Sequence, residues 1–205
     1  MLNFTFHNPT RIHFGEGQIK AIAKEIPADA KVLVTYGGGS IKANGVYDQV
    51  SEALSGHTWH EFSGIEPNPS YDTLIKALDI IKEHKIDYLL AVGGGSVVDG
   101  TKFIAAAATF EGGDPWDIVA KQKKITSALP IGAVLTLPAT GSETNTGAVV
   151  TRNGNKLPFS SALVRPLFAV LDPAVTLTLS DRQISNGVVD AFVHTMEQYL
   201  TYSVN

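Results

Sequence analysis

Apolar runs alternate with amphipathic stretches along the first two-thirds of the chain. Continuous, largely β-branched or apolar runs at residues 31–36 (KVLVTY) and 87–95 (DYLLAVGGG) predict strands that are buried on both faces. Around them, apolar residues recur at helical spacing in the segments 17–26, 40–54, 70–85 and 96–110. Strand and helix alternating at this spacing predict βαβ units, that is, an α/β fold with a Rossmann-like parallel sheet and helices on its faces.

The two ends of the chain follow other patterns. Residues 3–14 (NFTFHNPTRIHF) alternate polar and apolar side chains around Asn8 and Pro9, which predicts an N-terminal hairpin that caps the domain. From about residue 125 the pattern changes to strands and turns, and after Ser180 it becomes purely helical. The chain therefore contains an α/β domain followed by a helical segment.

Composition and charge narrow the classes of partner. The chain has 205 residues, is 44% hydrophobic, carries a formal net charge of −4 and contains no cysteine. No basic run is long enough for a nucleic-acid patch, and no apolar run approaches the roughly 20 residues needed to cross a bilayer. The first residues lack the features of a signal peptide. We expect a cytoplasmic protein whose partner is a small molecule, with neither nucleic acid nor membrane as a ligand.

Two glycine runs carry the strongest chemical signal. GGGS occurs at 37–40 and again at 93–96, each time between a predicted buried strand and a helix start. Glycine allows a close backbone approach to a ligand, serine can cap the following helix, and a helix N-terminus favours an anion such as phosphate. Neither run fits the G-x-G-x-x-G or the Walker pattern. One run alone is typical of a flexible turn, but two at equivalent strand ends favour a ligand site.

Asp99 follows the second glycine run within one helical turn of the predicted helix start. A carboxylate there suits the helix dipole but repels a neighbouring phosphate. It can bind a ribose hydroxyl or an amide, or serve only the electrostatics of the helix end, and the spacing leaves both interpretations open.

The segment 186–200 (NGVVDAFVHTMEQYL) predicts a helix that carries an acid and an imidazole four residues apart. Asp190 and His194 therefore share one face and could chelate one ion, while the apolar residues of this segment lie on another face. A surface hydrogen bond between the two side chains is the alternative, because two ligands alone do not make a metal site.

Five motifs in this order resemble the iron-containing, metal-dependent alcohol dehydrogenases, and specifically the bacterial branch of NADPH-dependent aldehyde reductases and butanol dehydrogenases. The motifs are the two glycine runs, GIEPNPSY at 64–71, LPATGSETN at 137–145 and NGVVDAFVHTMEQYLT at 186–201. The resemblance runs from the first residues to the last. It implies the architecture of dehydroquinate synthase, with a dinucleotide-binding α/β domain at residues 1–180 and the first helices of an all-helical domain at residues 181–205.

The resemblance also implies a divalent metal, iron or zinc, held by one Asp and three His in the cleft between the two domains. The Asp and the first His of the family pattern correspond to Asp190 and His194. The remaining two ligands of the family lie beyond residue 205, so we expect this chain to be the N-terminal half of the enzyme.

The resemblance further assigns residues to an NADP(H) cofactor. The glycine residues Gly37, Gly38 and Gly39 with Ser40 would lie near the adenosine ribose, Asn68 near the adenine, and Gly94, Gly95, Ser96 and Asp99 near the diphosphate and the nicotinamide half. Thr136, Thr140, Ser142 and Lys156 match further contacts. The chain departs from the wider family at ATGSE (139–143), where most members have a longer Thr-Thr-Ala-Gly-Thr-Gly-Ser-Glu stretch. For Thr140 and Ser142, ordinary turn hydrogen bonding is the alternative.

The implied activity is hydride transfer between NADP(H) and a small alcohol or aldehyde, with no general acid or base evident in this chain. NADPH is expected over NADH because no carboxylate follows the first glycine run until Asp48, while Lys42 lies near enough to help bind a 2′-phosphate. The alternatives are a catalytically inactive nucleotide-binding fragment and a relative of glycerol dehydrogenase. A homodimer could form through the exposed edge of the predicted hairpin.

Overall fold

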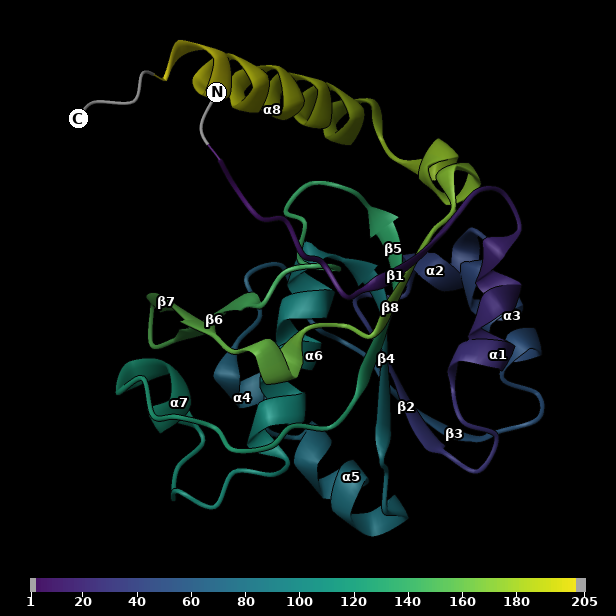
Figure 1. Ribbon diagram of the computed structural model, residues 1–205. Coiled ribbons are helices and arrows are strands. Elements are labelled where there is room, and N and C mark those ends of the chain that lie inside the picture. Colours follow the sequence, from purple (N-terminus) through teal and green to yellow (C-terminus); the bar gives the residue numbers. More distant parts are fainter. Residues whose placement is uncertain (1–2, 202–205) are drawn as a thin grey trace.

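The computed structural model describes residues 3–201 and contains a six-stranded, fully parallel sheet with the order β1-β8-β5-β4-β2-β3 (Figure 1). Its strands are β1 (Arg11–Phe14), β2 (Lys31–Tyr36), β3 (Thr58–Phe62), β4 (Tyr88–Gly94), β5 (Ile131–Leu137) and β8 (Phe168–Leu171). A separate antiparallel pair joins β6 (Gly147–Arg152) to β7 (Asn155–Ser160). The predicted α/β fold with a parallel sheet is confirmed.

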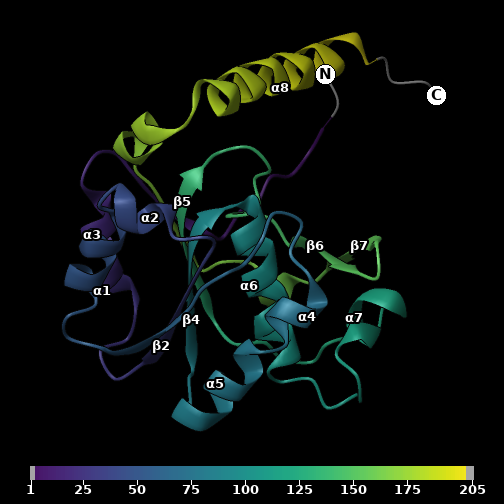
Figure 2. The same cartoon turned by 180° about the vertical axis from the view of Figure 1, so that it is seen from behind.

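Helices cover both faces of the sheet. One face carries η1 (Gln18–Ala21), α1 (Ile22–Glu25), α2 (Ser40–Ala43) and α3 (Val46–Ala53). The other carries α4 (Tyr71–Leu74), α5 (Ala77–His84), α6 (Gly95–Ala107) and α7 (Trp116–Ala120), together with β6 and β7, and the two views in Figures 1 and 2 show these groups on opposite sides. Three further elements, η2 (Ala162–Val164), η3 (Pro173–Thr178) and α8 (Asp181–Leu200), complete the described part of the chain.

Alternate side chains of the central strands enter two separate hydrophobic cores. In β2, Val32 and Val34 pack on the α3 side, whereas Leu33 packs on the α6 side. The neighbouring strand β4 repeats this division, as the two-residue period of a strand requires. Both strands are buried except at Lys31 and Gly94 because they lie in the interior of the sheet, which explains their continuous apolar sequence.

The connections leave β2 and β4 in opposite directions. The chain continues from β2 to the outer strand β3 through α2 and α3, and from β4 to β5 through α6 on the other face. The carboxyl ends of β2 and β4 therefore form the switch point of the sheet, where open α/β folds bind ligands. Each of these strands ends at one of the two glycine runs.

The predicted N-terminal hairpin is wrong. Within the described residues, only 11–14 of this segment form a strand, and β1 pairs in parallel with β8. Distant partners fix it there: the Thr10 hydroxyl donates to the Pro166 carbonyl at 2.8 Å, and the Gly17 N–H donates to the Asp172 carboxylate at 2.7 Å. β1 is nevertheless an edge strand.

Helix α8 begins at a complete capping box and lies apart from the sheet, above the loop after β5 (Figure 1). The backbone N–H of Gln183 donates to the Ser180 hydroxyl at 3.4 Å, and the Gln183 side-chain carbonyl accepts from the Ser180 N–H at 3.2 Å. No residue of α8 is buried, and Phe192 is 64% exposed. The helix predicted after Ser180 is confirmed, and its apolar side chains face solvent. Among the described residues, no helix is long and apolar enough to cross a membrane.

Candidate functional site

The first glycine run turns the chain sharply between β2 and α2. Gly39 has a φ of 98°, which side-chain-bearing residues rarely adopt. A Cβ atom on Gly37 would lie 3.1 Å from the carbonyl oxygen of Ile65, so the backbone passes close to the segment after β3. This turn leaves the end of β2 open at the switch point.

The second glycine run joins β4 directly to α6. Gly94 ends the strand and Gly95 starts the 13-residue helix, whose first turn has N–H groups without partners in the helix. A Cβ atom on Gly95 would lie 2.5 Å from the Thr140 hydroxyl, so a side chain at this position would require Thr140 to move where α6 meets the loop after β5. The free N–H groups and the dipole of α6 make this point suited to an anion.

The predicted serine caps are wrong. Ser40 and Ser96 lie inside α2 and α6, after the N-cap glycines Gly39 and Gly94, and neither helix has a side-chain cap. The N-cap lies one residue before Ser40 and two residues before Ser96, because glycine itself takes the cap position in both helices. The Ser96 hydroxyl instead accepts from the Asn68 N–H at 3.3 Å, which ties the 66–69 loop to α6.

Two neighbouring cavities meet at the start of α6. The first, about 590 Å³, lies between the glycine runs, and the second, about 580 Å³, lies between α6, the loop after β5 and the β6–β7 pair. Gly95 and Ser96 line both cavities. Together the cavities extend along the carboxyl ends of the strands from β2 to the β6–β7 pair.

The residues that the sequence assigns to a cofactor divide between these cavities. Gly37, Gly38, Ser40, Gly94, Gly95, Ser96 and Thr136 line the first cavity, and Asn68, Gly95, Ser96, Asp99, Thr140, Ser142 and Lys156 line the second. Gly39 lines neither cavity and shapes the first turn. The sequence interpretation did not include Asn145 or Gln122, which also line the second cavity.

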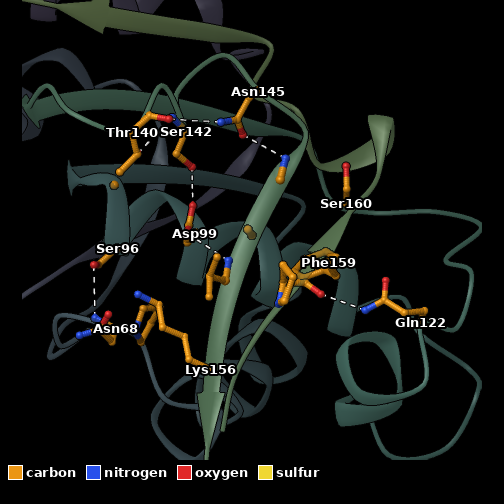
Figure 3. A pocket seen from close by; sticks show the side chains of 16 residues that line it. Asn68, Ser96, Asp99, Gln122, Thr140, Ser142, Asn145, Lys156, Phe159 and Ser160 are labelled. Carbon is orange, nitrogen blue, oxygen red and sulfur yellow. Dashed lines mark hydrogen bonds between the residues drawn. The ribbon is translucent and has the colours of Figure 1, made fainter. Parts of the chain in front are cut away.

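Asp99 is already hydrogen-bonded through both carboxylate oxygens (Figure 3). Its Oδ1 accepts from the Ser142 hydroxyl at 2.5 Å and its Oδ2 from the Val149 N–H at 3.0 Å. Because α6 begins at Gly95, Asp99 is its fifth residue and not in the first turn, contrary to the sequence interpretation. Its visible role is to join α6 to the loop after β5 and to β6.

Lys102 lies one turn further along α6 and is completely buried. Its ammonium group donates to the Ser142 hydroxyl at 2.9 Å, to the Asn145 side-chain oxygen at 2.9 Å and to the Gly147 carbonyl at 2.7 Å. Burial lowers the pKa of Lys102 to about 8. The sequence interpretation missed this residue, although a single cation within the apolar run VVDGTKFIAAAA was a signal for it.

The β6–β7 pair that carries Lys156 is fixed to the rest of the domain. The Thr151 N–H donates to the Pro69 carbonyl at 2.9 Å. The Arg152 guanidinium lies 4.2 Å from the ring centre of Tyr71 and pairs with Asp114 at 3.1 Å. Lys156 is thereby held at the second cavity, near Asn68 (Figure 3).

A third cavity of about 1000 Å³ lies between α8, η3 and the loop after β5, and Asp190 and His194 line it. Thr140 is common to the second and third cavities. The Nε2 atom of His194 lies 3.6 Å from Oδ1 of Asp190, with the side chains 62% and 52% exposed. An imidazole and a carboxylate on one helix face suit a zinc or iron ion, but no group of three or more candidate ligands occurs within residues 3–201. The pair could therefore supply only part of a metal site.

Comparison with known proteins gives a consistent family match. The model of the family described as iron-containing alcohol dehydrogenase matches residues 9–173. The NADPH-dependent aldehyde reductase YqhD of Escherichia coli (strain K12) is 60% identical over 209 residues, which cover 100% of this chain and 54% of that protein. The probable NADH-dependent butanol dehydrogenase 1 of Bacillus subtilis (strain 168) is 49% identical over 210 residues, which cover 100% of this chain and 54% of that protein.

Solved structures match in the same way. The crystal structure of E. coli K-12 YqhD superimposes with a TM-score of 0.92 at 60% identity and covers 99% of this chain and 53% of that chain. For the NADH-dependent butanol dehydrogenase A of Thermotoga maritima the TM-score is 0.88 at 47% identity, with coverage of 95% and 50%. The chain spans about half the length of the relatives that it matches.

Proposed function

This chain belongs to the iron-containing alcohol dehydrogenase family, and from that premise we propose that its α/β domain binds NADPH across the carboxyl ends of β2 and β4. The domain would serve as the cofactor-binding part of an enzyme that interconverts small aldehydes and alcohols. Residues 1–180 would form this cofactor domain, and residues 181–205 would begin a helical domain.

One observation carries the proposal: Gly95 and Ser96, at the N-terminus of α6, line both the cavity between the glycine runs and the cavity beside Lys156. A dinucleotide has two halves joined by an anionic diphosphate. In the proposed pose the diphosphate binds the free N–H groups of α6, with the adenosine half in the first cavity and the nicotinamide half in the second. The two cavities, each close to 600 Å³, leave room for one half apiece.

The choice of NADPH rests on the first glycine run. Neither the run itself nor its cavity lining contains a carboxylate that would accept a 2′-hydroxyl and repel a 2′-phosphate. Ser40 and backbone N–H groups of the turn can donate to the phosphate instead. The relatives include proteins described as NADPH-dependent and as NADH-dependent, so this choice needs a direct measurement.

Asp190 and His194 would hold a divalent metal from one face of α8, together with ligands outside residues 3–201. A dinucleotide held there would supply the hydride, and a metal held by Asp190 and His194 would supply Lewis-acid polarisation of the aldehyde oxygen. The residues of this chain would bind and orient the cofactor, and Thr140 of the loop after β5, which lines both the second and the third cavity, would lie where the nicotinamide half approaches the metal side.

The binding proposal is tested by calorimetric titration of the purified chain with NADPH and with NADH. We expect saturable binding of NADPH with an affinity greater than that of NADH. A folded chain that binds neither dinucleotide at millimolar concentration would contradict the proposal.

A nucleotide-binding module without catalysis is the second candidate, because the described residues contain only two convergent metal ligands. The two candidates are separated by NADPH absorbance with a short aliphatic aldehyde and added Zn²⁺ or Fe²⁺. We expect no measurable turnover by the 205-residue chain, and turnover by a chimera extended with the remaining residues of the E. coli relative. Loss of the chimera's turnover in His194→Ala would support the enzyme, and an inactive chimera that binds NADPH would support the binding module.

A further inference from the structure

A buried charge network underlies the second cavity. Lys102 and Asp99 lie three residues apart on α6, and the Ser142 hydroxyl joins them by accepting from Lys102 and donating to Asp99. Lys102 also holds Asn145 and the Gly147 carbonyl, while Asp99 holds the Val149 N–H. The whole segment from Ser142 to Val149 is thereby attached to one face of α6.

The lysine itself does not reach the ligand space. Its side chain is fully buried and lines none of the three cavities, whereas Asp99, Ser142 and Asn145 all line the second. All three ammonium hydrogens have acceptors, and two of those acceptors are on cavity-lining side chains. Lys102 is therefore suited to position other residues, not to contact a cofactor.

The network also offsets the negative charge that Asp99 places near the proposed diphosphate site. Asp99 is half-buried on the helix that would bind an anionic diphosphate, and an uncompensated carboxylate there would repel it. Lys102 supplies the compensating positive charge, and the Ser142 hydroxyl bridges its ammonium group to the Asp99 carboxylate. In a buried environment such a pair is far more favourable than either charge alone.

We propose that Lys102 is a positioning residue for the nicotinamide half of the cofactor: it offsets the charge of Asp99 and fixes the 142–149 segment that forms the wall of the second cavity. The inference rests on the proposed function. It predicts that loss of the lysine weakens only ligands that enter the second cavity.

The test compares two ligands on Lys102→Met, which keeps most of the length of the side chain and removes its charge. NADPH fills both cavities, whereas 2′,5′-ADP contains only the adenosine half and stays near the first glycine run. We expect NADPH affinity to fall by about tenfold or more and 2′,5′-ADP affinity to change by less than about twofold. Lys121→Met, which removes an exposed lysine that pairs with Asp117, serves as the control and should change neither.

The double variant Asp99→Asn/Lys102→Met separates charge compensation from simple damage to the fold. Removing the carboxylate charge should restore most of the NADPH affinity and of the melting temperature lost in Lys102→Met, because no uncompensated charge remains. If Lys102→Met does not fold, the affinities of the double variant for NADPH and for 2′,5′-ADP provide the test by themselves. Unchanged NADPH affinity in folded Lys102→Met, an equal loss for both ligands, or a folded double variant that binds only 2′,5′-ADP would overturn the inference. Failure of the unsubstituted chain to bind NADPH would overturn the proposed function as well.

Discussion

The ammonium group of Lys42 lies 3.1 Å from the carboxylate of Glu61, which β3 presents beside the first glycine run. The same carboxylate accepts hydrogen bonds from the hydroxyls of Tyr36 and Tyr47, and the Lys42 ammonium lies 4.4 Å from the ring centre of Tyr47. Lys42 is therefore held over the aromatic rings and does not line the first cavity. Its charge is directed to Glu61 and not to the place where a 2′-phosphate would bind.

Glu61→Gln should raise the ratio of NADPH affinity to NADH affinity. The substitution leaves one oxygen acceptor for the two tyrosines, releases Lys42 and removes a negative charge near the proposed 2′-phosphate. An exposed charge contact is worth up to about 1 kcal/mol, so we expect an increase of up to about fivefold, measured by calorimetry at low salt. Lys42→Met alone should change the ratio little, and Glu61→Gln/Lys42→Met should lose most of the gain. A gain retained in that double variant would show that Lys42 does not act on the phosphate.

Gly39→Asp should reverse the preference for NADPH, because it places a carboxylate where a 2′-phosphate is proposed to bind and a 2′-hydroxyl could donate to it. A Cβ atom there meets nothing within 4 Å, but the φ of 98° strains any side chain. Gly39→Asn carries the same strain without the charge and is the matched control. Calorimetry with both cofactors should show reversal only in the Asp variant, and equal ratios in the two variants would show that this turn does not set the choice.

NADPH affinity should decrease as the pH rises through about 8. Burial lowers the pKa of Lys102 to about 8 from its usual 10.5, against the opposing effect of Asp99 and Glu143, while Arg165 lowers it further. Above that pH the folded chain loses the charge that offsets Asp99. Titrations from pH 7 to pH 9.5 should show the decrease in the unsubstituted chain and none in Lys102→Met.

The same lowered pKa of Lys102 makes the free energy of unfolding rise with pH, whereas the NADPH affinity falls. Between pH 8 and 10.5 the unfolded chain binds a proton at this lysine that the folded chain lacks, so Lys102 contributes a rise in the free energy of unfolding with pH. The comparison with Lys102→Met isolates this contribution. A pH profile of unfolding by urea that is identical for the two proteins would contradict a lowered pKa.

Gly95→Ala should abolish NADPH binding and lower the melting temperature. The new methyl group would lie 2.5 Å from the Thr140 hydroxyl and within 3.4 Å of two more Thr140 side-chain atoms, so α6 or the loop after β5 must move. Overpacking of this kind costs about 1–3 kcal/mol, which lowers the melting temperature of a domain of this size by several degrees. Gly38→Ala is the control for the fold, since its Cβ meets nothing within 4 Å. Normal NADPH affinity in Gly95→Ala would show that the close packing of Gly95 against Thr140 is not needed for cofactor binding.

The sequence predicts the elements whose pattern is local. The buried strands at 31–36 and 88–94 and the helix after Ser180 follow from period and capping, and the two glycine runs meet at the switch point as equivalent strand ends should. The prediction of a hairpin at residues 3–14 is wrong because alternation of polar and apolar residues indicates a strand but not the strand with which it pairs. Glu61 and Lys102 were missed for a related reason: their roles depend on Lys42 and Ser142, which only the folded chain brings near. The roles of Asp190 and His194 remain predictions.

The pairing of β1 with β8 constrains the order in which the strands of the sheet can pair during synthesis on the ribosome. Synthesis proceeds from the N-terminus, yet the Gly17 N–H must wait for Asp172, 155 residues further along, and β1 has no neighbour in the sheet other than β8. The strands β2, β3 and β4 can associate much earlier, because their partners emerge within a short stretch of chain. The first strand of the sheet to be synthesised is thus the last to join it, and the nascent chain carries this strand as an unpaired segment until β8 has been synthesised.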